Sequence, residues 1–202
     1  NPTSAISAVS SSGYVYIRNN LVYGSGGQFG INVFSRKSFA VTGAEISGNT
    51  MRINGITTNS YQLVVSGFSK KQQGINLQIF NNRIESPGNI SNRGMIFEGI
   101  WSGAQGVDGA KVYNNYIDTK EHGNPEYGDQ GWTHGFRMRD SDEYTYPIPE
   151  TKFFNNEFYN NTFKTTGYYV SATENGDGIG VRLTLKFKLP AGELPNVFHD
   201  NI

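Results

Sequence analysis

Residues 112–117 read VYNNYI, and this pair of asparagines between apolar residues recurs along the chain. The same pattern stands at 17–22, 79–84, 153–158 and 158–163, with degenerate versions at 48–49 and 200–201. In each of the five pairs, the residue two before the pair and the residue two after it are apolar. Composition alone predicts about two such pairs in a chain of this length, so the pattern indicates an internal repeat.

The spacing of the pairs fits a repeat with loops of variable length. Counted from the second asparagine through 20, 49, 82, 115, 156 and 201, the intervals run from 29 to 45 residues. Each interval contains a second, alternating segment that glycine usually opens, at 30–33, 61–65, 94–97, 135–138 and 178–181. A third segment leads back into the pair, as at 75–79 and 110–112. Three short strands per repeat predict one coil of a β-solenoid.

Asparagine suits the corner of such a coil for two reasons. Its short side chain tolerates the left-handed backbone conformation, and it hydrogen-bonds nearby backbone groups. Stacked coils lie about 4.8 Å apart, so one asparagine per coil would form a ladder of amides that satisfy each other. The alternative is a set of unrelated asparagine-rich surface turns. Phe158 belongs to two overlapping motifs, so one of these is expected to be a local insertion.

The recurring corner and the glycine-led strands resemble the right-handed parallel β-helix, or pectate-lyase-like, superfamily over residues 14–202. The resemblance implies an all-β, right-handed parallel β-helix of about five to six coils. Residues 1–202 form one domain, with long loop insertions near 119–131 and 140–151. Because the chain starts without Met and stops within a corner at 197–202, we expect a fragment of a longer solenoid.

Composition excludes several classes of protein. Lys and Arg number 17, as do Asp and Glu, so the formal net charge is zero and a nucleic-acid partner is not expected. No apolar run is long enough to span a membrane. There is no cysteine and there are only three histidines, which argues against thiol chemistry and a zinc site. No cofactor is expected. The segment 173–178, TENGDG, suits either a plain turn or, as the alternative, calcium.

Stacking of the glycine-led strands predicts a charged outer face. With residues 178–181 aligned to 135–138, Glu98, Arg139 and Arg182 fall into one outward column, and Arg137 falls into the column beside it. A carboxylate between guanidinium groups grips an anionic sugar, or else forms a ladder of ion pairs.

Two polar, aromatic insertions flank the strand that carries Arg137. Long loops on a rigid scaffold commonly carry binding residues, and aromatic rings beside polar groups suit sugars. We therefore predict Glu98, Trp101, Trp132, Arg137, Arg139 and Arg182 as substrate-binding residues. His134, Asp140, Asp142 and Glu143 are the predicted groups for proton transfer. The alternative is a solvated loop charge for each carboxylate and a strand-edge side chain for His134.

The family resemblance implies an extracellular, carbohydrate-active β-helix, either a lyase or a hydrolase of polysaccharide. The alternative is a non-catalytic glycan-binding or structural solenoid, such as a tailspike, an adhesin or a surface-filament segment, on a cell or virion surface. The expected partner is a polysaccharide or glycan. The alternating stretch 179–189 also predicts association through the C-terminal edge, either in a homo-oligomer or with a continuing solenoid.

Overall fold

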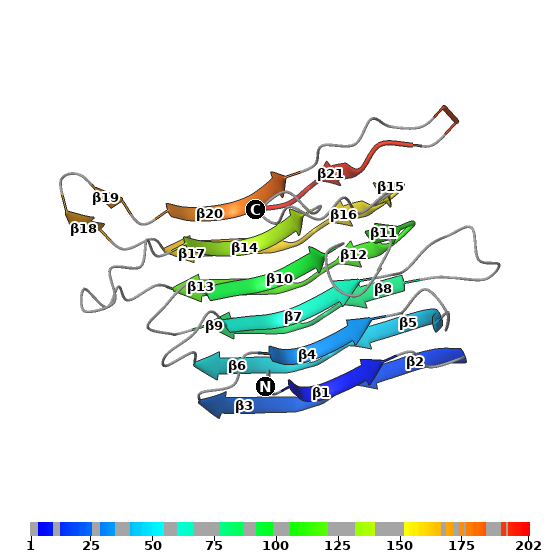
Figure 1. Cartoon of the computed structure of the whole chain (residues 1–202), viewed down its shortest axis with the longest axis horizontal. Helices are drawn as coiled ribbons and strands as arrows, with labels where there is room; N and C mark the ends of the chain where they lie inside the picture. The colour runs from blue at the N-terminus through cyan, green and yellow to red at the C-terminus, as the bar shows by residue number, and fades with distance from the viewer. Residues whose placement is uncertain are drawn as a thin grey trace, which may run out of the picture.

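The computed structural model describes residues 4–9, 13–25, 29–34, 41–54, 60–66, 77–86, 92–98, 106–120, 132–139, 152–166, 169–171, 174–175, 177–184, 191–192 and 194–202. Every regular element among them is a β-strand (Figure 1). Sheet A contains β1 (Ser4–Val9), β4 (Phe29–Phe34), β7 (Ser60–Ser66), β10 (Asn92–Glu98), β14 (Trp132–Arg139) and β20 (Asp177–Thr184).

Two further sheets complete the walls. Sheet B contains β2 (Gly13–Arg18), β5 (Val41–Ser47), β8 (Leu77–Phe80), β12 (Lys111–Tyr113), β16 (Glu157–Tyr159) and β21 (Val197–His199). Sheet C contains β3 (Leu21–Ser25), β6 (Thr50–Asn54), β9 (Arg83–Ser86), β13 (Tyr116–Lys120) and β17 (Thr162–Thr166). The remaining strands are the parallel pair β11 (Gly106–Asp108) and β15 (Lys152–Phe154), and the antiparallel pair β18 (Tyr169–Ser171) and β19 (Glu174–Asn175).

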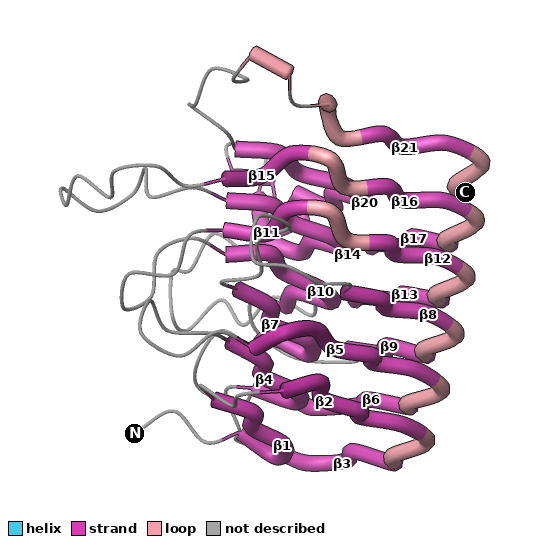
Figure 2. The backbone as a smooth tube through the Cα atoms, turned by 90° about the vertical axis from the view of Figure 1, so that its right-hand side faces the viewer, coloured by secondary structure: helices cyan, strands magenta, loops and turns pink. Residues whose placement is uncertain are grey.

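Apart from the β18–β19 pair, consecutive strands of the chain lie in different sheets, and the neighbours within sheets A, B and C are all parallel. The strands are therefore stacked in layers, with the loops between sheets B and C one above another along one edge (Figure 2). This is the architecture of a parallel β-solenoid. It confirms the all-β, parallel stack predicted from the asparagine repeat.

The first residue of each corner has the left-handed conformation. The asparagines and the aspartate at this place have φ between 53° and 57°: Asn19, Asn81, Asn114, Asn155, Asn160 and Asp200. Gly48 takes the same place with φ of 62°. Asparagine and aspartate tolerate this region better than most residues, so the paired motif places a suitable residue where the chain must turn.

The second residue of each corner forms the amide ladder. Its members are Asn20, Asn49, Asn82, Asn115, Asn161 and Asn201. The backbone N–H and the Nδ2 of each donate to Oδ1 of the next, at 2.9–3.1 Å. From Asn49 onward, Nδ2 also donates to a carbonyl of the preceding layer at 2.8–3.0 Å, which is that of Ile46 for Asn82. The buried amides between the ends of the ladder are thus fully satisfied, which excludes unrelated surface turns.

The overlapping motifs at 153–163 belong to two different corners. Asn161 continues the main ladder, whereas Asn156 belongs to a second, shorter one. In the second ladder the Ala110 N–H donates to Asn156 Oδ1 at 2.9 Å, and Asn156 Nδ2 donates to Asn196 Oδ1 at 2.8 Å. Neither motif is an irregular insertion: the second ladder turns the chain between β15 and β16.

Four of the five described strands of sheet A that follow β1 carry glycine at the same level, where the sheet bends. The register places Gly30, Gln62, Gly94, Gly135 and Gly180 at one level of the stack. A Cβ at Gly94 would lie 2.4 Å from Ile117 Cγ2, and one at Gly135 would lie 2.7 Å from the Gly180 carbonyl oxygen. Side chains here would point into the core. Gln62 is accommodated because its amide pairs with the backbone N–H and C=O of Ile53 at 2.9 and 2.8 Å.

The residues that follow this bend alternate as predicted. Ile31, Leu63, Met95 and Phe136 are fully buried in the main core. The alignment of the last strand was wrong by two residues, because Gly180 and not Gly178 lies at the bend beside Gly135. Consequently Val181 and Leu183 occupy the inward columns, next to Phe136 and Met138.

Candidate functional site

The predicted charged column on sheet A is present only in part. Glu98 lies in register with Arg139, as expected. Arg182, however, pairs with Arg137, and Arg139 pairs with Thr184, so the prediction that Arg182 continues the Glu98–Arg139 column was wrong. The cause is the two-residue shift at Gly180, which moves every following residue of β20 along the sheet.

Two predicted residues of sheet A are closed off from solvent. His134 and Arg137 are both 0% exposed. Near them, Phe29, Val64 and Ile96 form a second buried apolar cluster, separate from the main core. In this conformation neither His134 nor Arg137 reaches a polymer in solution.

The other predicted site residues are not placed by the structure. Of Glu98, Trp132, Arg139 and Arg182 it describes the backbone and not the side chain. Trp101, Asp140, Asp142 and Glu143 lie outside the described residues, as do 121–131 and 140–151 of the two insertions. From 173–178, Glu174, Asn175 and residues 177–178 are described, in β19 and β20.

Sheet C carries a charged pocket that was not predicted. The pocket has a volume of about 120 Å³ and is lined by Arg52, Glu85, Ser86, Asp118 and Lys120, from β6, β9 and β13. The register explains how these residues meet. Arg52, Glu85, Asp118 and Lys164 each lie three positions after a ladder asparagine, and they are consecutive neighbours on four parallel strands. Counting three residues from each asparagine would have revealed this column in the sequence.

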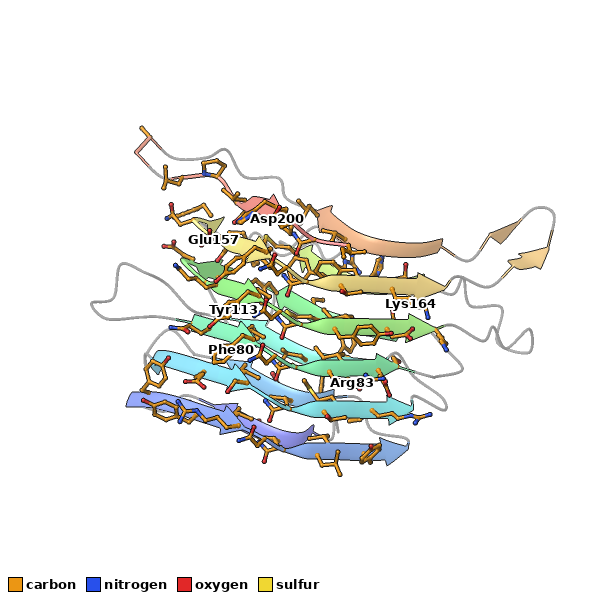
Figure 3. The ribbon with its side chains drawn as sticks, turned by 180° about the vertical axis from the view of Figure 1, so that it is seen from behind. Phe80, Arg83, Tyr113, Glu157, Lys164 and Asp200 are labelled. Atoms are coloured by element: carbon orange, nitrogen blue, oxygen red, sulfur yellow. The ribbon has the colours of Figure 1, made fainter. Side chains whose placement is uncertain are left out.

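The two carboxylates of the pocket differ in their hydrogen bonds. Arg83 pairs with Glu85, and its Nε donates to Glu85 Oε1 at 2.6 Å. Tyr116 donates its hydroxyl to Asp118 Oδ2 at 3.3 Å, and Lys164 Nζ lies 3.9 Å from the same oxygen. The Arg83 guanidinium also lies over the Tyr116 ring, 5.0 Å from its centre. Figure 3 shows Arg83 and Lys164 on this sheet.

Two oxygens at the pocket lack a hydrogen bond. Asp118 Oδ1 is buried and has no partner, although the side chain as a whole is 14% exposed. Ser86 is 1% exposed, and its Oγ also has no partner. A buried acceptor without a donor costs about 1–3 kcal/mol. Neither oxygen is accessible, and it is the carboxylate groups of Glu85 and Asp118 that make the pocket suited to a molecule with hydrogen-bond donors.

The charges of the pocket argue against a bare metal ion. Arg52 and Lys120 balance Glu85 and Asp118, so the lining has no net charge. In the described part of the chain, no group of three or more His, Asp or Glu side chains is close enough to hold a metal. Mixed donors and acceptors suit a neutral polar group, such as the hydroxyl edge of a sugar.

Sheet B, beside the pocket-bearing sheet, carries a stack of aromatic rings. Phe80, Tyr113, Tyr159 and His199 succeed one another, with ring centres 4.9, 5.0 and 5.4 Å apart and nearly parallel planes. Figure 3 shows Phe80 and Tyr113 on this face. Stacking covers the ring faces that point along the column, so mainly ring edges are left for a ligand. The stack therefore stabilises the solenoid and is a poor platform for sugars.

Glu45 and His199 are two of the groups on sheet B whose pKa is shifted. A hydrogen bond from Arg18 lowers the pKa of Glu45, and a second bond from Ser47 adds to this. His199 lies between Asp200, with Nδ1 at 2.8 Å from Oδ2, and Glu157, with Nε2 at 3.4 Å from Oε1. The bond to Asp200 raises the pKa of His199 above its ordinary 6.5, and Glu157 contributes further.

Comparison with known proteins gives no relatives: no family model, curated protein or solved structure matches the chain. Among the residues described, no helix has the length and apolar character needed to cross a membrane.

Proposed function

We propose that this protein is an extracellular carbohydrate-binding β-solenoid, and that the sheet C pocket holds one residue of a polysaccharide. The observation that carries the proposal is the charge-balanced pocket lined by Arg52, Glu85, Ser86, Asp118 and Lys120 on sheet C. A sugar hydroxyl can donate to the Asp118 carboxylate, and the neighbouring Glu85 accepts from a second hydroxyl. Arg52 and Lys120 can donate to the acceptor oxygens of the same ring.

The fold supports an extended ligand. The column that contains Glu85 and Asp118 crosses successive parallel strands about 4.8 Å apart. A polymer that runs along the solenoid axis would therefore cross several of these strands. We further propose the right-handed winding and the five to six coils of the pectate-lyase-like solenoids, because parallel crossovers are right-handed in almost all proteins. The surface of a cell or virion is the proposed location.

The test is binding to a panel of uronate-containing and neutral polysaccharides, compared between the parent chain and two nearly isosteric variants. Asp118→Asn replaces one acceptor oxygen with an amide and removes the charge that sugar hydroxyls favour. We expect affinity to fall about 10- to 100-fold, since hydrogen bonds to charged groups are worth about 1.5–3 kcal/mol. Glu157→Gln on sheet B is the matched control and should leave affinity unchanged. Equal binding by the parent chain and Asp118→Asn would exclude the pocket as the site.

A polysaccharide lyase or hydrolase that uses the opposite face is the second candidate. The observation that favours it is the register of Glu98 beside Arg139 on sheet A, on the strand that also carries His134. Arg139 and Arg182 would neutralise an acidic sugar, and Asp140, Asp142 or Glu143 would move the proton. Unsaturated products absorbing in the ultraviolet would indicate a lyase, and new reducing ends without that absorbance a hydrolase. No product from any polysaccharide, with binding retained, would exclude this candidate.

A further inference from the structure

The charges along sheet C form an ordered series. Starting at β6, the register aligns Arg52, Glu85, Asp118 and Lys164 on successive strands. The order of charge is therefore positive, negative, negative, positive. At about 4.8 Å per strand, the two cations lie about 14 Å apart, with the carboxylates midway between them.

The centre of this series offers no excess positive charge to an anionic sugar. Glu85 is paired with Arg83, Asp118 lies 3.9 Å from Lys164, and the charges that line the pocket sum to zero. The carboxylates accept hydrogen bonds, which a hydroxyl, an amide or an ammonium group supplies. The sugar over the pocket should therefore be neutral or carry an amino group.

The two ends of the series select for anionic sugars. Arg52 forms no ion pair with any residue that the structure describes, and it lines the pocket. Lys164 is 58% exposed and lies 3.9 Å from Asp118, a distance at the limit of an ion pair. Each cation lies about one and a half strand spacings from the centre of the pocket, roughly 7 Å, which fits a group on the next sugar. Both remain able to bind a carboxylate or sulfate there.

We infer that the ligand is an alternating acidic polysaccharide, in which a neutral or amino sugar occupies the Glu85–Asp118 pocket and acidic sugars contact Arg52 and Lys164. This inference rests on the proposed carbohydrate-binding function and names the class of polymer.

The experiment is calorimetric titration of the whole chain with three oligosaccharides of equal length. These are an alternating glucuronate–N-acetylglucosamine tetrasaccharide, a tetragalacturonate and a cellotetraose. We expect the alternating oligosaccharide to bind at least about tenfold more tightly than either of the others, with an affinity that falls as salt rises. Arg52→Gln and Lys164→Gln should each weaken this binding about three- to fivefold. Lys111→Gln, an exposed lysine on sheet B, is the control and should have no effect.

The outcomes separate this inference from the proposed function. Equal or tighter binding of tetragalacturonate or of cellotetraose, with loss in Asp118→Asn, would overturn the alternating ligand and retain a carbohydrate site. Alternating-ligand binding that is insensitive to both Arg52→Gln and Lys164→Gln would also overturn it. Absence of binding to all three oligosaccharides, and to the polysaccharide panel, would overturn both proposals.

Discussion

Asn82 lies in the middle of the amide ladder, and its replacement by Ala should be among the most damaging changes to a polar residue. The side chain takes part in four buried hydrogen bonds: Nδ2 donates to Ile46 O and Asn115 Oδ1, and Oδ1 accepts from the N–H and Nδ2 of Asn49. At about 1 kcal/mol each, their loss costs roughly 4 kcal/mol. The whole fold of a typical domain is stable by only about 5–15 kcal/mol. The Asn49 donors and the Ile46 carbonyl would also lose a buried partner, so the loss of stability should be at least this large.

The measurement is denaturant unfolding followed by circular dichroism, with Asn20→Ala as the matched control. Asn20 starts the ladder, where its Oδ1 accepts no hydrogen bond from another described residue, and its Nδ2 donates to Asn49 Oδ1 and to the exposed Arg18 carbonyl. We expect about 1 kcal/mol of destabilisation for Asn20→Ala. For Asn82→Ala the urea midpoint should fall by at least about 1 M at an unchanged slope. Equal shifts of the urea midpoint for the two variants would contradict a stabilising role for the buried part of the ladder.

The glycine bend and the C-terminal histidine give two further predictions. Gly94→Ala should destabilise the fold by about 3 kcal/mol in the same unfolding assay, because its Cβ would lie 2.4 Å from Ile117 Cγ2. Gly180→Ala is the control: its Cβ would meet only Phe163, at 3.7 Å, so stability should change by less than about 0.5 kcal/mol. The pKa of His199 is raised in the folded state, so its stabilising contribution is complete below about pH 6.5 and is lost as pH rises through the folded pKa. Amide exchange in β21 should therefore become faster, relative to its intrinsic rate, between about pH 6 and pH 8. An equal change in His199→Gln would show that His199 is not the group responsible.

The asparagine pairs allowed much of the fold to be predicted, because each residue of the pair has a separate physical task. The first residue adopts the left-handed turn, and the second joins the ladder, so both positions carry a strong signal. The register of the last strand was harder to predict because Gly178 and Gly180 stand two residues apart, and both fit an alternating pattern. Only the close approach of Gly135 to the Gly180 carbonyl decides between them.

The candidate site was less predictable than the fold. Arg52, Glu85 and Asp118 are separated by 33 residues at each step, and only their common distance of three positions from a ladder asparagine connects them. They meet because the ladder sets the register of β6, β9 and β13. On sheet A, alternation correctly placed Phe136 and Met138 in the core, but it could not show that His134 and Arg137 are buried as well. Periodicity indicates which face a residue takes and not whether that face meets solvent.

The most direct test of the carbohydrate site is an NMR titration of the side-chain carboxyl carbons with the alternating glucuronate–N-acetylglucosamine tetrasaccharide. We expect the signals of Asp118 and Glu85 to shift together and to saturate at one affinity, whereas those of Glu157 on sheet B and Glu98 on sheet A should stay unchanged. A saturating shift at Glu98 with none at Asp118 would place the ligand on the opposite face, and would contradict the assignment of the sheet C pocket as the carbohydrate site.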